Sequence, residues 1–160
     1  MKRFLLFFTA LLALCPAFAQ SLFDSVADMP GVSSTYISNE FLSNTGTSGG
    51  AIYLNGASIP AENYRSLEII SADEDSSTKP EVVAAACRKI IDGMDLELLL
   101  RTRDDDGYNR IYVGRPDGNN SSKIILIESK DEDSYQLVYM RGEFDVKELA
   151  RRYSNLNLNM

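Results

Sequence analysis

Three short acidic runs are the part of this sequence that first suggests chemistry: Asp73-Glu74-Asp75, Asp104-Asp105-Asp106 and Asp131-Glu132-Asp133. Carboxylate oxygens are the ligands that Ca²⁺ prefers, and an EF-hand loop needs a glycine at its sixth position and a glutamate at its twelfth. With Gly107 in the sixth position, the loop would begin at Thr102 and end at Val113, and neither residue is a carboxylate. Aspartate also favours turns by itself. The sequence therefore predicts no metal site.

The nucleophiles and bases of common enzymes are largely missing. The chain has no histidine, the commonest general base and metal ligand, which disfavours zinc sites and Ser-His or Cys-His catalysis. Cys87 lies beside Ala86 and Ile90 on the apolar side of a predicted helix, so we expect it in the core. Pairing between molecules in an oxidising compartment is the alternative. We therefore expect no catalytic residue, no cofactor and no enzyme activity.

The glycine-rich segment Gly46–Gly50 lacks the Gly-Lys-Ser/Thr ending of a phosphate-binding loop. It is predicted to be a surface loop.

The N-terminus has the three parts of a secretory signal peptide. Lys2 and Arg3 are positive, residues 4–14 are apolar, and Ala17-Phe18-Ala19 matches the small-x-small pattern that signal peptidase reads. Cleavage after Ala19 would make Gln20 the first mature residue. The apolar run is shorter than the about 20 residues that span a bilayer, so no stable membrane anchor is expected after cleavage.

Cys15 offers an alternative, in which the product is a lipoprotein. Lipoprotein signals place a small residue before the acylated cysteine, whereas here Leu14 precedes it and Pro16 follows. We therefore expect export to the periplasm of a Gram-negative bacterium, with lipidation at Cys15 as the alternative. The expected organisation is a signal peptide at 1–19 and a single domain at 20–160, with a frayed tail at 154–160.

The charge of the chain limits its partners. Taking Lys2 and Arg3 from the 16 basic residues leaves 14 against 23 acidic ones, a net formal charge of −9 for the mature protein. An acidic surface repels phosphate backbones and anionic lipid headgroups. We therefore expect no nucleic-acid partner.

The elements that must position these side chains are mostly strands. Apolar and β-branched periodicity, bounded by turn residues, predicts strands at 32–38, 51–54, 64–72, 96–103, 108–115, 123–130 and 134–142. Short connections between the last four of them predict an antiparallel meander. Short helical segments are expected at 21–29, before Pro30-Gly31, and at 39–44.

Two longer helices are expected. The first covers 79–94, with Thr78 and Glu81 as a capping box. Its apolar face has helical spacing and comprises Val83, Ala86, Cys87, Ile90, Ile91 and Met94.

The second long helix covers 145–153. Asp145 is its predicted N-cap with Glu148 at the third position, and Phe144 is expected to pack on Leu149. The predicted fold is α+β: an antiparallel meander sheet of about five or six strands, with the two main helices packed on one face.

Alternation along the strands suggests a partner surface. Leu96, Leu98 and Leu100 are expected to face the core, together with Ile111 and Val113. The face away from the two long helices would then carry a mixed band of aromatic, aliphatic and arginine side chains, typical of interfaces: Leu99, Tyr108, Arg110, Tyr112 and Tyr139. The alternative is that residues 21–29 cover this face as ordinary core.

Several short motifs, spread over nearly all of the mature chain, match one known family. They are Phe23-Asp24, Pro30-Gly31-Val32 leading into Tyr36-Ile37-Ser38, Leu67-Glu68-Ile69-Ile70-Ser71, Ile124–Glu128 and Gly142-Glu143-Phe144-Asp145-Val146-Lys147-Glu148-Leu149-Ala150. On these motifs the chain resembles domain-of-unknown-function family 4252, found mostly in Bacteroidetes. The glycine-rich insert near 45–50 departs from the family pattern. The resemblance implies a small exported envelope protein and brings no catalytic residues with it.

Two functions remain open from the sequence. The first is a non-catalytic exported protein that binds a protein partner, associates with itself or helps to maintain the envelope. The alternative is a hydrolase or small-ligand-binding enzyme that uses Asp/Glu pairs. Buried, clustered carboxylates with raised pKa values would favour the enzyme, and carboxylates confined to hairpin tips would favour the binding protein.

Overall fold

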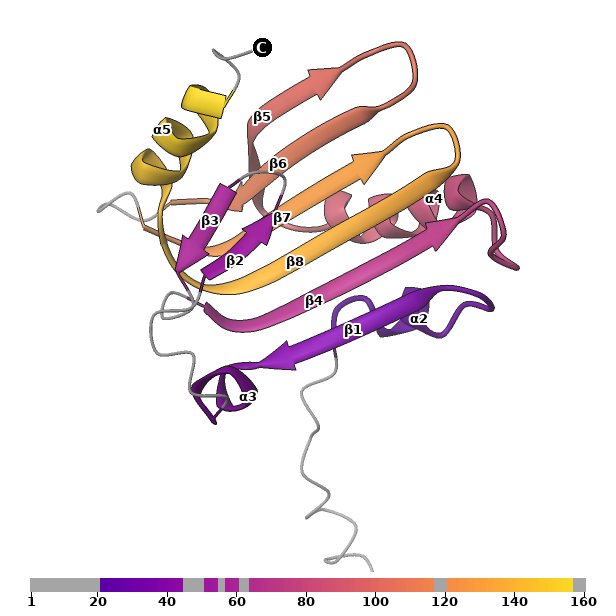
Figure 1. Cartoon of the computed structure of the whole chain (residues 1–160), viewed down its shortest axis with the longest axis horizontal. Coiled ribbons are helices and arrows are strands. Elements are labelled where there is room, and N and C mark those ends of the chain that lie inside the picture. The colour runs from indigo at the N-terminus through magenta and orange to yellow at the C-terminus, as the bar shows by residue number, and fades with distance from the viewer. Residues whose placement is uncertain (1–20, 45–50, 55–56, 61–63, 117–120, 157–160) are drawn as a thin grey trace, which may run out of the picture.

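The structure is a computed structural model, which describes residues 21–44, 51–54, 57–60, 64–116 and 121–156 (Figure 1). The expected signal peptide with its cleavage site Ala19–Gln20, the alternative lipidation site Cys15 and the glycine-rich segment Gly46–Gly50 lie outside the described residues.

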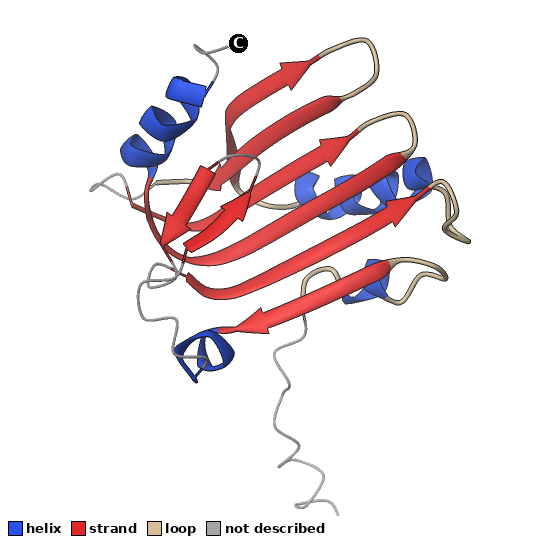
Figure 2. Ribbon diagram, in the orientation of Figure 1, coloured by secondary structure: helices blue, strands red, loops and turns tan. Residues whose placement is uncertain are grey.

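The centre of the fold is an open antiparallel sheet of six strands in the order β1-β4-β8-β7-β6-β5 (Figure 2). Its strands are β1 (Ser33–Ser38), β4 (Tyr64–Asp73), β5 (Leu96–Arg103), β6 (Tyr108–Gly114), β7 (Ser121–Lys130) and β8 (Ser134–Asp145). The predicted meander is confirmed as β5 to β8, and β8 then pairs with β4. A separate hairpin, β2 (Ala51–Leu54) with β3 (Ala57–Pro60), is drawn in front of the sheet in Figure 1.

Four helices accompany these strands in the described part of the chain. They are α2 (Asp24–Ala27), α3 (Asn39–Asn44), α4 (Pro80–Asp92) and α5 (Val146–Leu156). α4 passes behind the sheet in Figure 1, whereas α5 stands at one end of the strands. The second long helix therefore continues past residue 153, where the sequence predicted its end.

The sheet is apolar on both faces, and each face has its own cluster of buried side chains. One cluster joins α4 and α2 to the sheet through Val83, Cys87, Ile91, Phe23 and Val26, together with Ile70, Leu126 and Leu137. We call this side the α4 face. The other cluster joins Leu149 of α5 to Leu67, Ile111, Ile125, Ile127, Val138 and Met140. We call that side the α5 face.

The two long helices therefore do not share a face, contrary to the expectation from the sequence. On β8, Leu137 belongs to the α4 face and Val138 to the α5 face, because neighbouring residues of a strand point to opposite sides. The central strands carry apolar side chains on both faces, so both faces need a cover. α4 covers part of one face, and α5 covers part of the other.

The structure confirms two of the three local turn and cap predictions. Gly31, between α2 and β1, has φ +78°, a left-handed conformation that favours glycine, as the predicted turn requires. Asp145 caps α5 as predicted, since its Oδ1 accepts the backbone N–H groups of Lys147 and Glu148 at 2.9 and 3.1 Å. The prediction of a capping box before α4 is wrong, because no side chain caps this helix. The Thr78 hydroxyl instead donates to the carbonyl oxygen of Pro30 at 2.7 Å.

Candidate functional site

One row of side chains crosses all six strands on the α4 face and organises the candidate site. Residues directly opposite each other in an antiparallel sheet share a face. The cross-strand pairs run in the order Tyr36, Glu68, Tyr139, Leu126, Tyr112 and Leu98. A carboxylate and three tyrosines thus lie along one line, and α2 and α4 cover only its middle.

The residues of the predicted partner surface lie in different surroundings and do not form one surface. Tyr112 and Tyr139 belong to the buried cluster beneath α2 and α4, with 7% and 6% of their surface exposed. The expectation that they face away from both long helices is wrong. Residues 21–29 contribute to the cover, as the alternative interpretation held, because the ring of Phe23 packs on that of Tyr139.

The first meander strand also differs from its prediction. Leu98, expected in the core, is 45% exposed, whereas Leu99 and Leu100 both pack against the cluster of the α5 face. The register between β5 and β6 shifts between Leu98 and Leu100. A bulge at this point breaks the alternation on which the prediction relied.

Tyr108 and Arg110, the remaining members of the predicted surface, hold a buried carboxylate. Glu128 on β7 is fully buried; its Oε1 accepts the Tyr108 hydroxyl at 3.0 Å and its Oε2 lies 3.3 Å from the Arg110 guanidinium. The Tyr135 hydroxyl reaches the same carboxylate at 3.5 Å, and Arg88 of α4 lies 3.9 Å away. A buried charge is tolerated only when it is paired and hydrogen-bonded, and this cluster meets both conditions.

The surroundings of Glu128 suit a structural role better than acid–base chemistry. Burial, followed by the charge of Glu128, raises the pKa of Tyr108 to about 12, so its phenol stays protonated and donates. The Arg110 guanidinium lies over the Tyr108 ring at 4.0 Å from its centre. Arg88 is held by the Tyr112 hydroxyl at 2.5 Å and by Asp92 at 2.9 Å. Every polar group of the cluster therefore already has a partner.

At the other end of the row, polar side chains line an open cavity. It measures about 270 Å³ and is lined mainly by Ser21, Tyr36, Ser66, Glu68, Tyr139 and Arg141. The Ser21 hydroxyl donates to Oε2 of Glu68, and Nε of Arg141 donates to the Ser66 hydroxyl at 3.0 Å. Tyr36 lies on β1, Ser66 and Glu68 lie on β4, and Tyr139 and Arg141 lie on β8. Ser21 lies just before α2.

The electrostatics of this cavity centre on Glu68. Burial raises the pKa of its carboxyl above the ordinary value, and the charge of Asp24 adds to the rise. The hydrogen bond from Ser21 and the charge of Arg141 act in the opposite direction without cancelling it. The Glu68 carboxyl therefore keeps its proton to a higher pH than an exposed glutamate does.

A second cavity, of about 420 Å³, shares Tyr36, Ser66 and Arg141 with the first and adds Arg65 and Lys123. Arg65 is paired with Glu143 at 3.5 Å on the exposed surface. Glu143 lines this cavity too, so its carboxylate offsets the charge of Arg65, and Arg141 and Lys123 supply the remaining positive charge at this end of the sheet.

Sequence reasoning missed both buried carboxylates. Glu68 follows Leu67 and precedes Ile69, and Glu128 follows Ile127 in an otherwise apolar stretch. A lone glutamate inside an apolar strand is the signal that points to a buried and partnered carboxylate. The acidic runs that drew attention first lie at exposed turns instead, at Asp73–Asp75, Asp104–Asp106 and Asp131–Asp133.

Among the described residues, no group of three or more His, Cys, Asp or Glu side chains is placed to hold a metal ion. No helix in the described part of the chain has the length and apolar character needed to cross a membrane.

Comparison with known proteins gives one match. A family model described as a domain of unknown function, DUF4252, matches residues 24–151. No curated protein and no solved structure matches the chain.

Proposed function

The chain belongs to the DUF4252 family, and we propose that it is an exported, non-catalytic module that binds the anionic group of a ligand or partner in the cavity around Glu68. Export rests on the signal-peptide pattern that ends at Ala17-Phe18-Ala19, which supports a periplasmic location.

The observation that carries the binding proposal is the convergence of polar groups around Glu68. Its buried carboxyl and the Ser66 hydroxyl come from β4, the Ser21 hydroxyl from the residues before α2 and the Arg141 guanidinium from β8, and all of them meet in one open cavity. Pockets that bind ligands combine an apolar wall with a few convergent polar groups, often with a perturbed pKa. Tyr36 and Tyr139 supply the aromatic wall here.

The charges favour an acid as the bound group. Arg141 offers charge-assisted hydrogen bonds to a carboxylate, and Lys123 adds positive charge from the adjoining cavity. A protonated Glu68 donates a hydrogen bond, whereas an ionised one repels an anion. Binding of an acid should therefore tighten as the pH falls towards the raised pKa of Glu68.

Calorimetric titration with acetate and D-glucuronate, with D-glucose as the neutral probe, tests the proposal. We expect one or both acids to bind and Arg141→Gln to weaken that binding about tenfold or more, since a charge-assisted hydrogen bond is worth about 1.5–3 kcal/mol. Glu68→Gln should bind with little dependence on pH. Arg115→Gln, which removes an exposed ion pair with Asp95, is the matched control and should bind as the wild type does.

Failure of both acids to bind would contradict the proposal. So would an affinity that is equal for D-glucose and D-glucuronate, or one that Arg141→Gln leaves unchanged.

A hydrolase is the second candidate, because Asp24 and Glu68 provide a pair of interacting carboxyls. Two carboxyls in different surroundings can act as acid and base. Glu128 does not join this pair, since it lies on β7 and β8 runs between it and Glu68. Turnover of fluorogenic esters or glycosides that is lost in both Glu68→Gln and Asp24→Asn, with binding retained, would favour the hydrolase over the binding module.

A further inference from the structure

The two edges of the six-stranded sheet differ in how they are protected. β1 ends the sheet on one side and β5 ends it on the other, and no described segment pairs with the outer side of either (Figure 2). An edge strand offers unpaired backbone N–H and C=O groups to any other strand. Bulges, charged residues and proline are the usual means of preventing such pairing.

β5 carries this protection. Its register shifts between Leu98 and Leu100, and Glu97, Arg101 and Arg103 place charges along it. A second strand that paired with β5 would meet a bulge and several charged side chains. This edge is therefore closed to regular strand addition.

β1 has none of these features. Its register with β4 runs unbroken from Ser33 to Ser38, and the strand contains no charged residue, no proline and no glycine. Its side chains are exposed over most of its length. The edge is thus a regular template for another strand.

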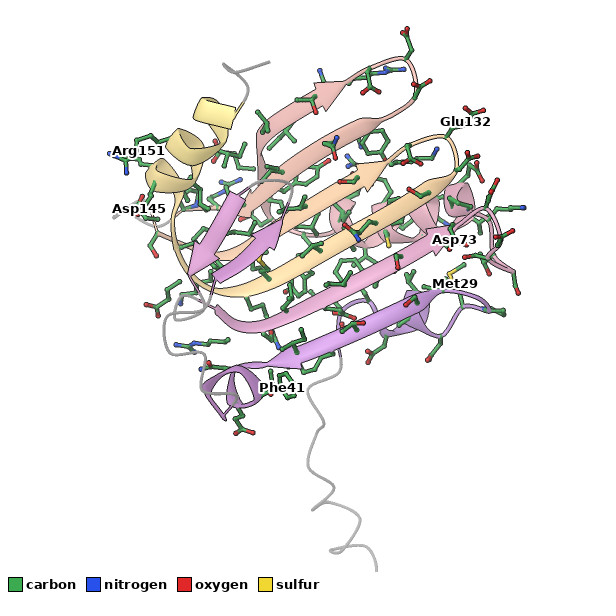
Figure 3. The ribbon with its side chains drawn as sticks, viewed as in Figure 1. Met29, Phe41, Asp73, Glu132, Asp145 and Arg151 are labelled. Atoms are coloured by element: carbon green, nitrogen blue, oxygen red, sulfur yellow. The ribbon has the colours of Figure 1, made fainter. Side chains whose placement is uncertain are left out.

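Large apolar side chains accompany this open edge. Leu22, just before α2, is 52% exposed, Tyr36 on β1 is 54% exposed and Phe41 on α3 is 60% exposed. Figure 3 labels Phe41 on α3, next to the end of β1. Exposed apolar side chains gathered along one edge favour a protein contact rather than a purely solvated boundary.

We propose that two copies of this chain pair through their β1 strands, antiparallel, to form one continuous sheet. A two-fold axis perpendicular to the sheet joins two antiparallel edges and keeps the α4 face of both copies on the same side. With the axis at Thr35 or Tyr36, the strand 33–38 is paired over most of its length. The side chain of Tyr36 then lies opposite or diagonal to the partner's Tyr36, within reach of an aromatic contact.

The charge of the chain limits where two copies can meet. The chain has a net charge of −7, so two copies repel each other over most approaches. The segment 33–38 is uncharged, so two identical acidic molecules can meet there without placing like charges against each other. The contact is also self-complementary, as a two-fold interface requires.

Pairing also bears on the cavity around Glu68. Tyr36 forms one wall of that cavity and stands on the edge strand. The partner's Tyr36 would stand beside this wall and narrow the open side of the cavity. The pairing itself needs no ligand, so it can be tested separately from the proposed function.

Charge exchange at Tyr36 tests the pairing. The wild type is expected to show a mass that rises towards twice that of the monomer with concentration in analytical ultracentrifugation. Tyr36→Lys alone and Tyr36→Glu alone should stay monomeric, because each symmetric pair would place two like charges together. An equimolar mixture of the two variants should restore dimers that contain one copy of each. Thr102→Lys, an exposed position on β5, is the matched control and should dimerise as the wild type does.

Circular dichroism must show that the variants melt as the wild type does, which is expected since Tyr36 is exposed. A wild type that stays monomeric at all concentrations would overturn the proposal. Variants that still dimerise alone, or a mixture that stays monomeric beside a dimeric wild type, would overturn β1 pairing. Ligand binding by a monomer would leave the proposed function intact, so the two failures are distinguishable.

Discussion

The ring of Phe23 meets the ring of Tyr139 edge to face, with centroids 5.5 Å apart and an angle of 63° between the planes. Phe23 immediately precedes α2, and Tyr139 stands in the central strand β8. Both side chains are buried. This contact fixes the N-terminal segment on the α4 face, and with it the Ser21 hydroxyl that reaches Glu68.

Removing the covered tyrosines should destabilise the fold. We expect Tyr112→Ser with Tyr139→Ser to lower the melting temperature strongly, because truncating a buried aromatic side chain costs about 3–5 kcal/mol. Tyr36→Ser, in the same row but exposed, is the matched control and should stay within about 0.5 kcal/mol of the wild type. Thermal melting checks this. A double variant that melts near the wild-type temperature would mean that Tyr112 and Tyr139 are not core residues.

Glu128 should be the most sensitive carboxylate for stability. Glu128→Ala leaves Tyr108, Tyr135 and Arg110 without their acceptor, and we expect a loss of about 2–4 kcal/mol in the free energy of unfolding. The loss is below that of a fully buried pair because Arg110 and Arg88 reach solvent.

The control for Glu128 is Glu143→Ala, which removes an exposed pair with Arg65 and should change stability by at most about 1 kcal/mol. Urea titration measures both variants. Equal losses at the two positions would show that the Glu128 cluster does not stabilise the fold.

Cys87 should be unreactive in the native protein. It is fully buried on α4, and burial raises the pKa of its thiol to about 11, although a hydrogen bond with Tyr135 acts to lower it. Because the thiolate is the reactive form, modification by Ellman's reagent should be slow in the native state and fast in denaturant. Rapid native modification would argue for an accessible and functional thiol.

Glu68 should make the protein less stable as the pH rises. Its folded-state pKa is raised above the ordinary value, mainly by burial, so folding favours the protonated form. The stabilising contribution is complete below the pKa of the unfolded chain and is lost as the pH rises through the folded pKa. The difference in unfolding free energy between Glu68→Gln and the wild type should therefore grow with pH and then level off.

Urea titrations of the wild type and Glu68→Gln at several pH values, from about 4 to about 8, measure this difference. Glu97→Gln, on the exposed surface of β5, serves as the control with a smaller change. Parallel pH profiles for the wild type and Glu68→Gln would contradict a raised pKa at Glu68.

We expect the mature protein to begin at Gln20. The residues Ala17-Phe18-Ala19 suit signal peptidase, whereas Leu14 and Pro16 make a poor context for lipidation at Cys15. Mass spectrometry of the protein purified from a bacterial envelope fraction measures the mature N-terminus. A diacylglyceryl group on Cys15 would instead establish the lipoprotein alternative.

Most of the elements could be predicted from the sequence because their causes are local. Asp104 and Gly107 close the β5–β6 turn within four residues, and Asp145 caps α5 through its own neighbours. Period-two alternation and turn residues likewise set the meander of the last four strands. These features depend on side chains and backbone groups a few positions apart, which the sequence shows directly.

Most of the strands, the long helices and the family resemblance could thus be predicted from the sequence alone, although β3 (Ala57–Pro60) could not, whereas tertiary packing set what lies above each strand face. Residues 124–127 are apolar on both sides of β7, so alternation could not tell which face α4 covers or that α5 lies on the other. Glu68 meets Ser21 across 47 positions, and Glu128 meets Arg88 of α4. Such contacts follow from how helices and strands pack, and packing energy depends on neighbours in space rather than along the chain.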